Sequence, residues 1–119
     1  MKFRKTFVTN SSSCSFLIEN KSDEHKTLTD FAHELINNLS EDAIRYYEDY
    51  YEGGIEEFKK KVIYFSPGSV HLSPHSSVEI ECGDSVCDDG AFEAIVHYEC
   101  IYGNNNLNNF AVKMLENHH

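Results

Sequence analysis

Two stretches of alternating apolar and polar residues in the C-terminal half place the strongest constraint on the fold. They are Ser77–Cys82 and Phe92–Tyr102, and the segment Gly83–Gly90 joins them. Alternation with a period of two is typical of strands that bury one face. We therefore expect an antiparallel hairpin, in a register that puts the apolar residues of both strands on the same side of the sheet.

That register predicts an acidic patch on the other face of the hairpin. Its residues are Glu79, Glu81, Glu93, His97 and Glu99, which we interpret as candidate binding residues. Like charges opposite each other destabilise a sheet by up to about 1 kcal/mol per pair. A bound cation, a basic partner surface, lysine or arginine from another strand, or plain hydration has to offset this repulsion. A sheet that is simply wet on one face is the alternative interpretation.

The middle of the chain is predicted to be helical. Three helices are expected: Leu28–Leu39, a second that Ser40 caps and that runs to Gly53-Gly54, and a short one over Ile55–Lys61. Thr27 and Asp30 form a shortened capping box before the first helix. The second helix is expected to turn Ile44, Tyr47 and Tyr51 inward.

The remaining segments complete an α+β pattern. Phe3–Ile18 predicts two short strands joined through Asn10–Ser13, Val62–Phe65 predicts a buried strand, and Leu107–Met114 has the spacing of a closing helix. The expected fold class is α+β, with a small antiparallel sheet that includes the C-terminal-half hairpin and two to four helices packed on it. Because 119 residues with 40 % hydrophobic content suffice for one core, residues 1–119 are expected to form a single domain.

The charge balance narrows the class of partner. Twenty acidic residues against ten lysines and arginines give a formal charge of −10, which disfavours direct binding to nucleic acid or to an anionic membrane. A protein with a basic surface fits better. The start MKFRKTF is not followed by an apolar run of signal length, and the four cysteines are interpreted as reduced thiols, so we expect a cytoplasmic protein.

A weaker pattern suggests a metal site. His71 and His75 have H-x3-H spacing, and Cys82 and Cys87 follow in the types that zinc prefers, with Cys100 as a further thiol. However, Pro74 prevents a helix from aligning the two histidines, and C-x4-C is looser than a zinc knuckle. Ordinary packing or surface roles are the favoured interpretation, and no cofactor is expected.

The second helix offers another hypothesis. The run EDAIRYYEDYYEGGIEEF combines acidic residues with four tyrosines, and this pattern suits a nucleic-acid mimic that inhibits a DNA-binding enzyme. The alternative is a solvated face held by ordinary i,i+4 charge pairs, with the tyrosines rimming the core.

The run FVTNSSSCSF, from Phe7 to Phe16, is the most distinctive string in the chain. A serine or cysteine nucleophile needs a base beside it, and the sequence does not place a histidine there, so a turn or strand edge is predicted. The run resembles the N-terminal FVTNSSSSSF signature of a loose group of small, uncharacterised bacterial and phage proteins, with Cys14 in place of a serine. This resemblance covers about the first eighteen residues and implies only a bacterial or mobile-element origin. A recognition or processing tag is a hypothesis for this segment.

The sequence thus favours a small acidic intracellular protein without catalytic activity. We expect it to bind a protein partner with a basic surface, through the acidic hairpin face or the acidic helix. A metal- or thiol-dependent protein using His71, His75, Cys82 and Cys87 is the first alternative, and the nucleic-acid mimic is the second. Because short strands expose a sheet edge that can pair with itself, a homodimer is one of the expected forms.

Overall fold

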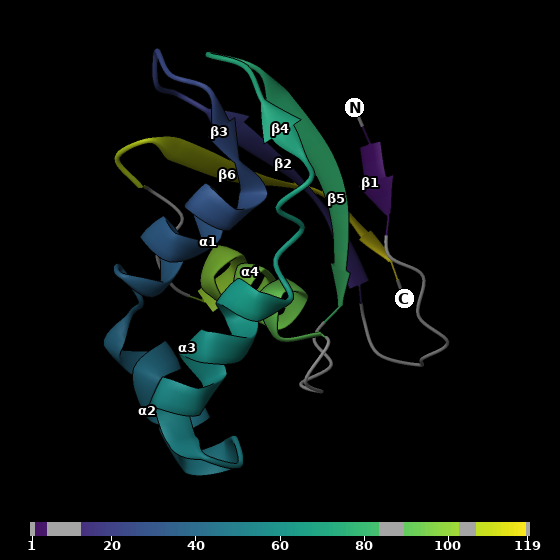
Figure 1. Ribbon diagram of the computed structural model, residues 1–119. Helices are drawn as coiled ribbons and strands as arrows, with labels where there is room; N and C mark the ends of the chain where they lie inside the picture. Colours follow the sequence, from purple (N-terminus) through teal and green to yellow (C-terminus); the bar gives the residue numbers. More distant parts are fainter. Residues whose placement is uncertain (1, 5–12, 84–89, 103–106, 119) are drawn as a thin grey trace.

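The computed structural model describes residues 2–4, 13–83, 90–102 and 107–118, and it has an α+β fold (Figure 1). The helices are α1 (Leu28–Ile36), α2 (Glu41–Tyr50), α3 (Gly54–Tyr64) and α4 (Ala91–Tyr102). The strands are β1 (Lys2–Arg4), β2 (Ser13–Asn20), β3 (Lys26–Thr27), β4 (His71–Leu72), β5 (Ser77–Gly83) and β6 (Phe110–His118). The expected fold class is confirmed: a small sheet with antiparallel pairing, which includes the C-terminal strand, is packed with helices.

The larger sheet has the strand order β1-β5-β2-β6. β2 pairs antiparallel with both β5 and β6, and β1 lies parallel to β5. The register places Ile18 opposite both Val78 and Val112, so one apolar row crosses three strands. The two strands expected in the first eighteen residues are present, but β5 lies between them. Their connection, residues 5–12, falls outside the described residues.

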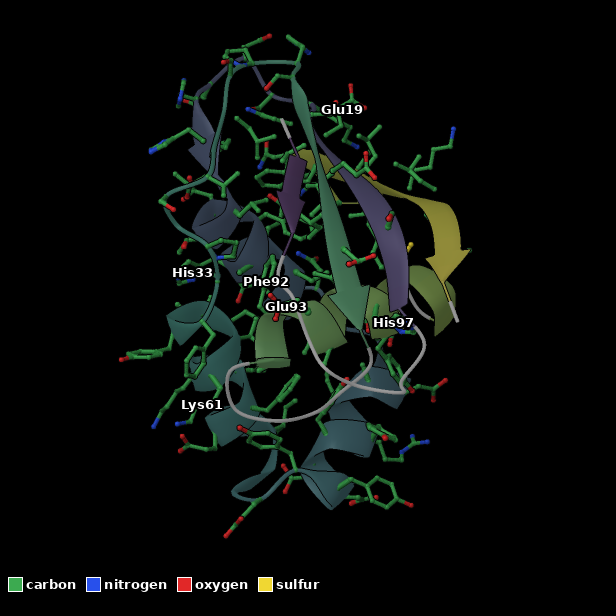
Figure 2. The ribbon with its side chains drawn as sticks, turned by 90° about the vertical axis from the view of Figure 1, so that its right-hand side faces the viewer. Glu19, His33, Lys61, Phe92, Glu93 and His97 are labelled. Atoms are coloured by element: carbon green, nitrogen blue, oxygen red, sulfur yellow. The ribbon has the colours of Figure 1, made fainter. Side chains whose placement is uncertain are left out.

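The sheet and the helices form two layers around one core. Figure 2 looks from the sheet side, and α4 lies behind β5, β2 and β6. The core contains Phe31, whose ring makes edge contacts with Phe92 at 6.1 Å and with Phe110 at 5.2 Å between centroids. All three rings are buried, so this cluster joins α1, α4 and β6. Within the described residues, no helix is long and apolar enough to cross a membrane.

α1 begins at the predicted capping box. The backbone N–H of Asp30 donates to the Thr27 hydroxyl at 3.1 Å, and the backbone N–H of Thr27 donates to the Asp30 carboxylate at 2.9 Å. Two of the donors that a helix start leaves open are satisfied in this way. The prediction of this helix and of its first turn is confirmed, but the helix ends at Ile36 and not at Leu39.

A tight corner joins α2 to α3. Gly53 precedes α3 with φ 97°, and a Cβ there would lie 2.8 Å from the Cβ of Glu57, which accounts for a glycine. Gly53 has no side chain to cap α3. Instead, the backbone N–H of Ile55 donates to Oε1 of Glu48 at 3.0 Å, so a carboxylate from α2 supplies the cap.

Three segments differ from their expected secondary structure. Val62–Tyr64 is the last turn of α3 and not a strand, Phe92–Tyr102 lies in α4, and the expected closing helix over Leu107–Met114 is largely replaced by β6. The segment from 91 to 97 is buried on every side, so its polar residues do not mark a wet face. The alternation therefore predicted a strand where the structure has a helix. The prediction assumed that polar residues are exposed and apolar ones buried, and in this segment both kinds are buried.

Candidate functional site

The five residues of the expected acidic patch do not share a surface. Glu79 and Glu81 lie half-buried on β5, whereas Glu93, His97 and Glu99 lie on α4 and are only 3 %, 7 % and 1 % exposed. Figure 2 shows Glu93 and His97 on α4, behind the strands. The prediction of an acidic hairpin face built from all five residues is therefore wrong, because the second stretch is not a strand but helix α4, which packs under the sheet.

Glu79 and Glu81 have basic neighbours in the strand register. β1 pairs with β5 so that Lys2 is the partner position of Glu79 and Arg4 that of Glu81. Lysine and arginine from another strand were one of the ways expected to offset the carboxylates of this strand.

Glu99 is part of the framework. Its Oε1 accepts from the Ser40 hydroxyl at 2.8 Å and from the Ser40 backbone N–H at 3.3 Å. Ser40 is the N-cap of α2, so a buried carboxylate of α4 sits at the positive end of that helix. This position accounts for a charged residue inside the core without a binding role.

Glu93 and His97 occupy the same side of α4 because they are four residues apart. The His97 ring makes an edge contact with Phe16 of β2, at 6.1 Å between centroids. Both side chains are buried behind the sheet, and they cannot meet a macromolecular partner without opening of the core.

The residues of the metal hypothesis have other neighbours. The ring of His71 lies 5.7 Å from the ring of His25, and Nε2 of His75 is 2.7 Å from Oδ1 of Asp23. Cys82 is in β5, where only its backbone is described, and Cys87 lies outside the described residues. In the described part of the chain, no group of three or more histidine, cysteine or carboxylate side chains is placed to hold a metal ion.

The exposed side of α2 is the candidate site that the structure favours. Asp42, Tyr46, Asp49 and Tyr50 occupy positions i, i+4, i+7 and i+8 of the helix, so they follow one stripe along it. All four are exposed, and Tyr50 is 76 % exposed. We call these four residues the acidic tyrosine stripe. Arg45, on the same helix, is 3.8 Å from the Asp42 carboxylate.

The tyrosines of the stripe pack against other aromatic rings of α2 and α4. The ring of Tyr46 lies 5.0 Å from that of Tyr50 and 5.5 Å from that of Tyr98 on α4. It also makes an edge contact with Tyr47, whose ring stacks on Phe58 of α3 at 3.8 Å. A continuous set of rings therefore connects the surface to the core and limits the motion of the exposed pair.

The sequence indicated this site only in part. The helix, its acidic residues and its tyrosines were identified, but Ile44 was expected inside and is 38 % exposed, while Ala43 is buried in its place. The tyrosines were interpreted as a rim of the core; Tyr46 lies at such a rim, in contact with buried Tyr47, whereas Tyr50 is 76 % exposed. If α2 is projected down its axis with Ala43 and Tyr47 facing the core, the stripe lies on the exposed side, so the sequence does contain the pattern that identifies it.

No family model matches the chain, and no significant similarity was found to a curated protein or to a solved structure.

Proposed function

We propose that the protein works by binding a basic, arginine-containing segment of another protein through the acidic tyrosine stripe. The observation that carries this proposal is the exposure of Tyr46 and Tyr50 beside Asp42 and Asp49. Exposed aromatic side chains with acidic neighbours are typical of an interface whose partner is cationic.

The chemistry of the stripe suits a guanidinium group. A tyrosine face attracts a cation with about 0.5–1 kcal/mol at an exposed site, and arginine also stacks on the ring. A carboxylate one turn away then accepts two parallel hydrogen bonds from the same guanidinium. Asp49 lies three positions after Tyr46, about one turn along the same side of α2, and the ring of Tyr50 lies 5.0 Å from that of Tyr46.

The net charge of −10 supports the same partner class. Long-range attraction raises the association rate of a basic segment. Because the stripe is exposed, this attraction is screened by salt and falls as the ionic strength rises through 0.1 M, where the Debye length is about 10 Å.

The test is a titration with two synthetic peptides of equal charge, one rich in arginine and one rich in lysine. Tighter binding of the arginine peptide is expected, and Tyr50→Ala is expected to weaken it about five- to tenfold because an interface aromatic is truncated. Asp49→Asn is expected to weaken it about threefold. Isothermal titration calorimetry at low salt measures all three.

Matched controls separate the stripe from general charge. Glu19→Gln removes one exposed carboxylate from β2, and Met114→Ala truncates an exposed apolar side chain on β6. Both are expected to bind the arginine peptide as the wild type does. Equal weakening by Glu19→Gln and Asp49→Asn, or no effect of Tyr50→Ala, contradicts the proposal.

A further inference from the structure

A groove of about 480 Å³ runs between α1 and α3 and shares no residue with the acidic tyrosine stripe. Its lining residues are Ile36, Glu56, Lys59, Lys60, Ile63 and Tyr64. Ile36 is the last residue of α1, and the other five belong to α3. Two helices thus form the walls.

The five residues of α3 form a single stripe. They occupy positions i, i+3, i+4, i+7 and i+8 from Glu56 to Tyr64, so they lie on one side of the helix and span a little more than two helical turns, roughly 12 Å along the axis. Ile36 of α1 and Ile63 and Tyr64 near the end of α3 give the groove its apolar lining, and the two lysines lie about one turn earlier along α3. Tyr64 is 78 % exposed and its ring packs on Phe65 at 4.8 Å.

The groove has a local excess of positive charge in an acidic chain. Lys59 Nζ is 3.7 Å from the Glu56 carboxylate, which balances one cation. Lys60 is exposed, and it forms no ion pair with any residue that the structure describes. One lysine is therefore available for an anionic group of a ligand.

We propose that this groove binds an acidic amphipathic helix of a partner protein. Docking of a helix into a groove uses apolar residues at i, i+3, i+4 and i+7, and two turns of such a helix match the length of the stripe on α3. The apolar residues of the partner contact Ile36, Ile63 and Tyr64, and a carboxylate one turn away lies against Lys60.

The walls of the groove favour a peptide over a small molecule. Glu56 has a side chain that is 80 % exposed, and Tyr64 and Lys60 are exposed as well. Small-molecule sites enclose most of their ligand's surface. A groove with such open walls leaves one side of its ligand in water, as the polar face of an amphipathic helix requires.

The probe is a synthetic helix of roughly 16 residues, long enough to become helical when bound, with leucines at i, i+3, i+4 and i+7 and glutamates between them. A scrambled peptide of the same composition and a version with lysine for glutamate serve as comparisons. Fluorescence anisotropy gives the affinity, and chemical-shift mapping of the labelled protein gives the location. Only the amphipathic acidic peptide is expected to shift residues of α1 and α3.

Two variants and two controls define the surface. Tyr64→Ala is expected to weaken binding about tenfold, and Lys60→Glu at least fivefold, because one removes an interface aromatic and the other reverses the available charge. Met114→Ala and Lys21→Glu make comparable changes at exposed positions on β6 and after β2, and both are expected to leave the affinity within about twofold. Thermal denaturation of each variant confirms that it is folded.

The proposal is overturned if the scrambled peptide binds equally well, if Lys60→Glu has no effect, or if the shifts map elsewhere. Sedimentation of the chain without peptide tests a second copy as the occupant. Concentration-dependent association that Lys60→Glu abolishes would assign the groove to self-association and overturn the partner assignment. The arginine-peptide titration of α2 is independent of these outcomes, because the two surfaces share no residue and take ligands of opposite charge.

Discussion

The hydroxyl of Ser40 donates a hydrogen bond to the buried carboxylate of Glu99, at 2.8 Å. Ser40 Oγ also accepts from the backbone N–H of Ala43 at 3.2 Å, so one hydroxyl connects the first turn of α2 to the middle of α4. The aromatic rings of the acidic tyrosine stripe rest on the same two helices. The orientation of the candidate site therefore depends on a partly buried contact at the start of α2.

Replacement of Glu99 tests this framework role. Glu99→Ala is expected to lower the free energy of unfolding by about 2–4 kcal/mol, because it leaves a cavity and removes the acceptor of two partly buried donors. Glu99→Gln retains the shape and one acceptor, so a smaller loss, about 1 kcal/mol, is expected. Urea unfolding measures both, with Glu41→Ala at an exposed position of α2 as the control. An unchanged midpoint for Glu99→Ala would favour a surface role.

Asn20 is a second framework residue whose loss is expected to be costly. Its side chain is fully buried, and Nδ2 donates to the backbone carbonyls of Glu24 at 2.7 Å, Leu72 at 3.1 Å and Ser73 at 3.2 Å. Asn20→Ala leaves these three carbonyls, of which that of Leu72 is buried, without that donor, so a loss of about 3 kcal/mol is expected.

The control for this change is Asn38→Ala, since Asn38 makes one exposed bond, from Nδ2 to the Glu34 carbonyl. A loss below about 1 kcal/mol is expected for it. Asn20→Asp is expected to be at least as damaging as the alanine variant, because it places a negatively charged carboxylate against the three carbonyl oxygens that Nδ2 contacts. Equal stability of the Asn20 and Asn38 alanine variants would contradict the framework role.

α1 and β5 could be predicted from the sequence, because the patterns that specify them lie within each element. α1 has a capping box and one apolar face, and its buried residues Leu28, Phe31 and Leu35 match the helical period. β5 also alternates as expected, since Val78 and Ile80 are buried between half-buried glutamates.

α4 and β6 were not predictable in this way. The alternation of α4 comes from Glu93, His97 and Glu99, which the protein buries, so polarity does not report exposure. Glu99 is satisfied by Ser40, 59 residues away in the sequence, and no local pattern encodes that contact. The groove was missed for the related reason that Ile63 and Tyr64 were assigned to a strand, whereas they are in the last turn of α3.

His75 is expected to tolerate glycine better than a branched side chain. It has φ 62° in a turn where Pro74 precedes it and the backbone N–H of Ser76 donates to the Ser73 carbonyl at 3.1 Å. A positive φ at this position is typical of a type II turn and favours glycine. His75→Gly is expected to change stability by less than about 1 kcal/mol, because backbone relief offsets the lost Asp23 contact.

His75→Val is the informative partner of that substitution. A β-branched residue at positive φ is strained, so a loss of more than about 1 kcal/mol is expected. Thermal unfolding of both variants and of Ser73→Val, at an exposed position of the same turn, measures the difference. If the glycine and valine variants at 75 are equally stable, the turn does not hold this backbone conformation.

Lys113 is expected to protect the edge of the sheet. β6 pairs with β2 on one side, and no other described strand lies against its second side. Lys113 is exposed there next to Met114 and Leu115, and the register shift between Ser15 and Phe16 makes Leu115 the extra residue of a bulge. Charged side chains and bulges both hinder the pairing of an edge with another chain.

Lys113→Val removes the charge from this edge and extends its apolar run. The variant is therefore expected to associate at lower concentration than the wild type, which light scattering coupled to size exclusion measures. Lys21→Val, at an exposed position outside the strands, is the control for the loss of one cation. An increase confined to Lys113→Val assigns the effect to β6, and it also identifies this strand as the edge through which the expected homodimer would form. Equal behaviour of the two variants would show that net charge, and not the edge, governs association.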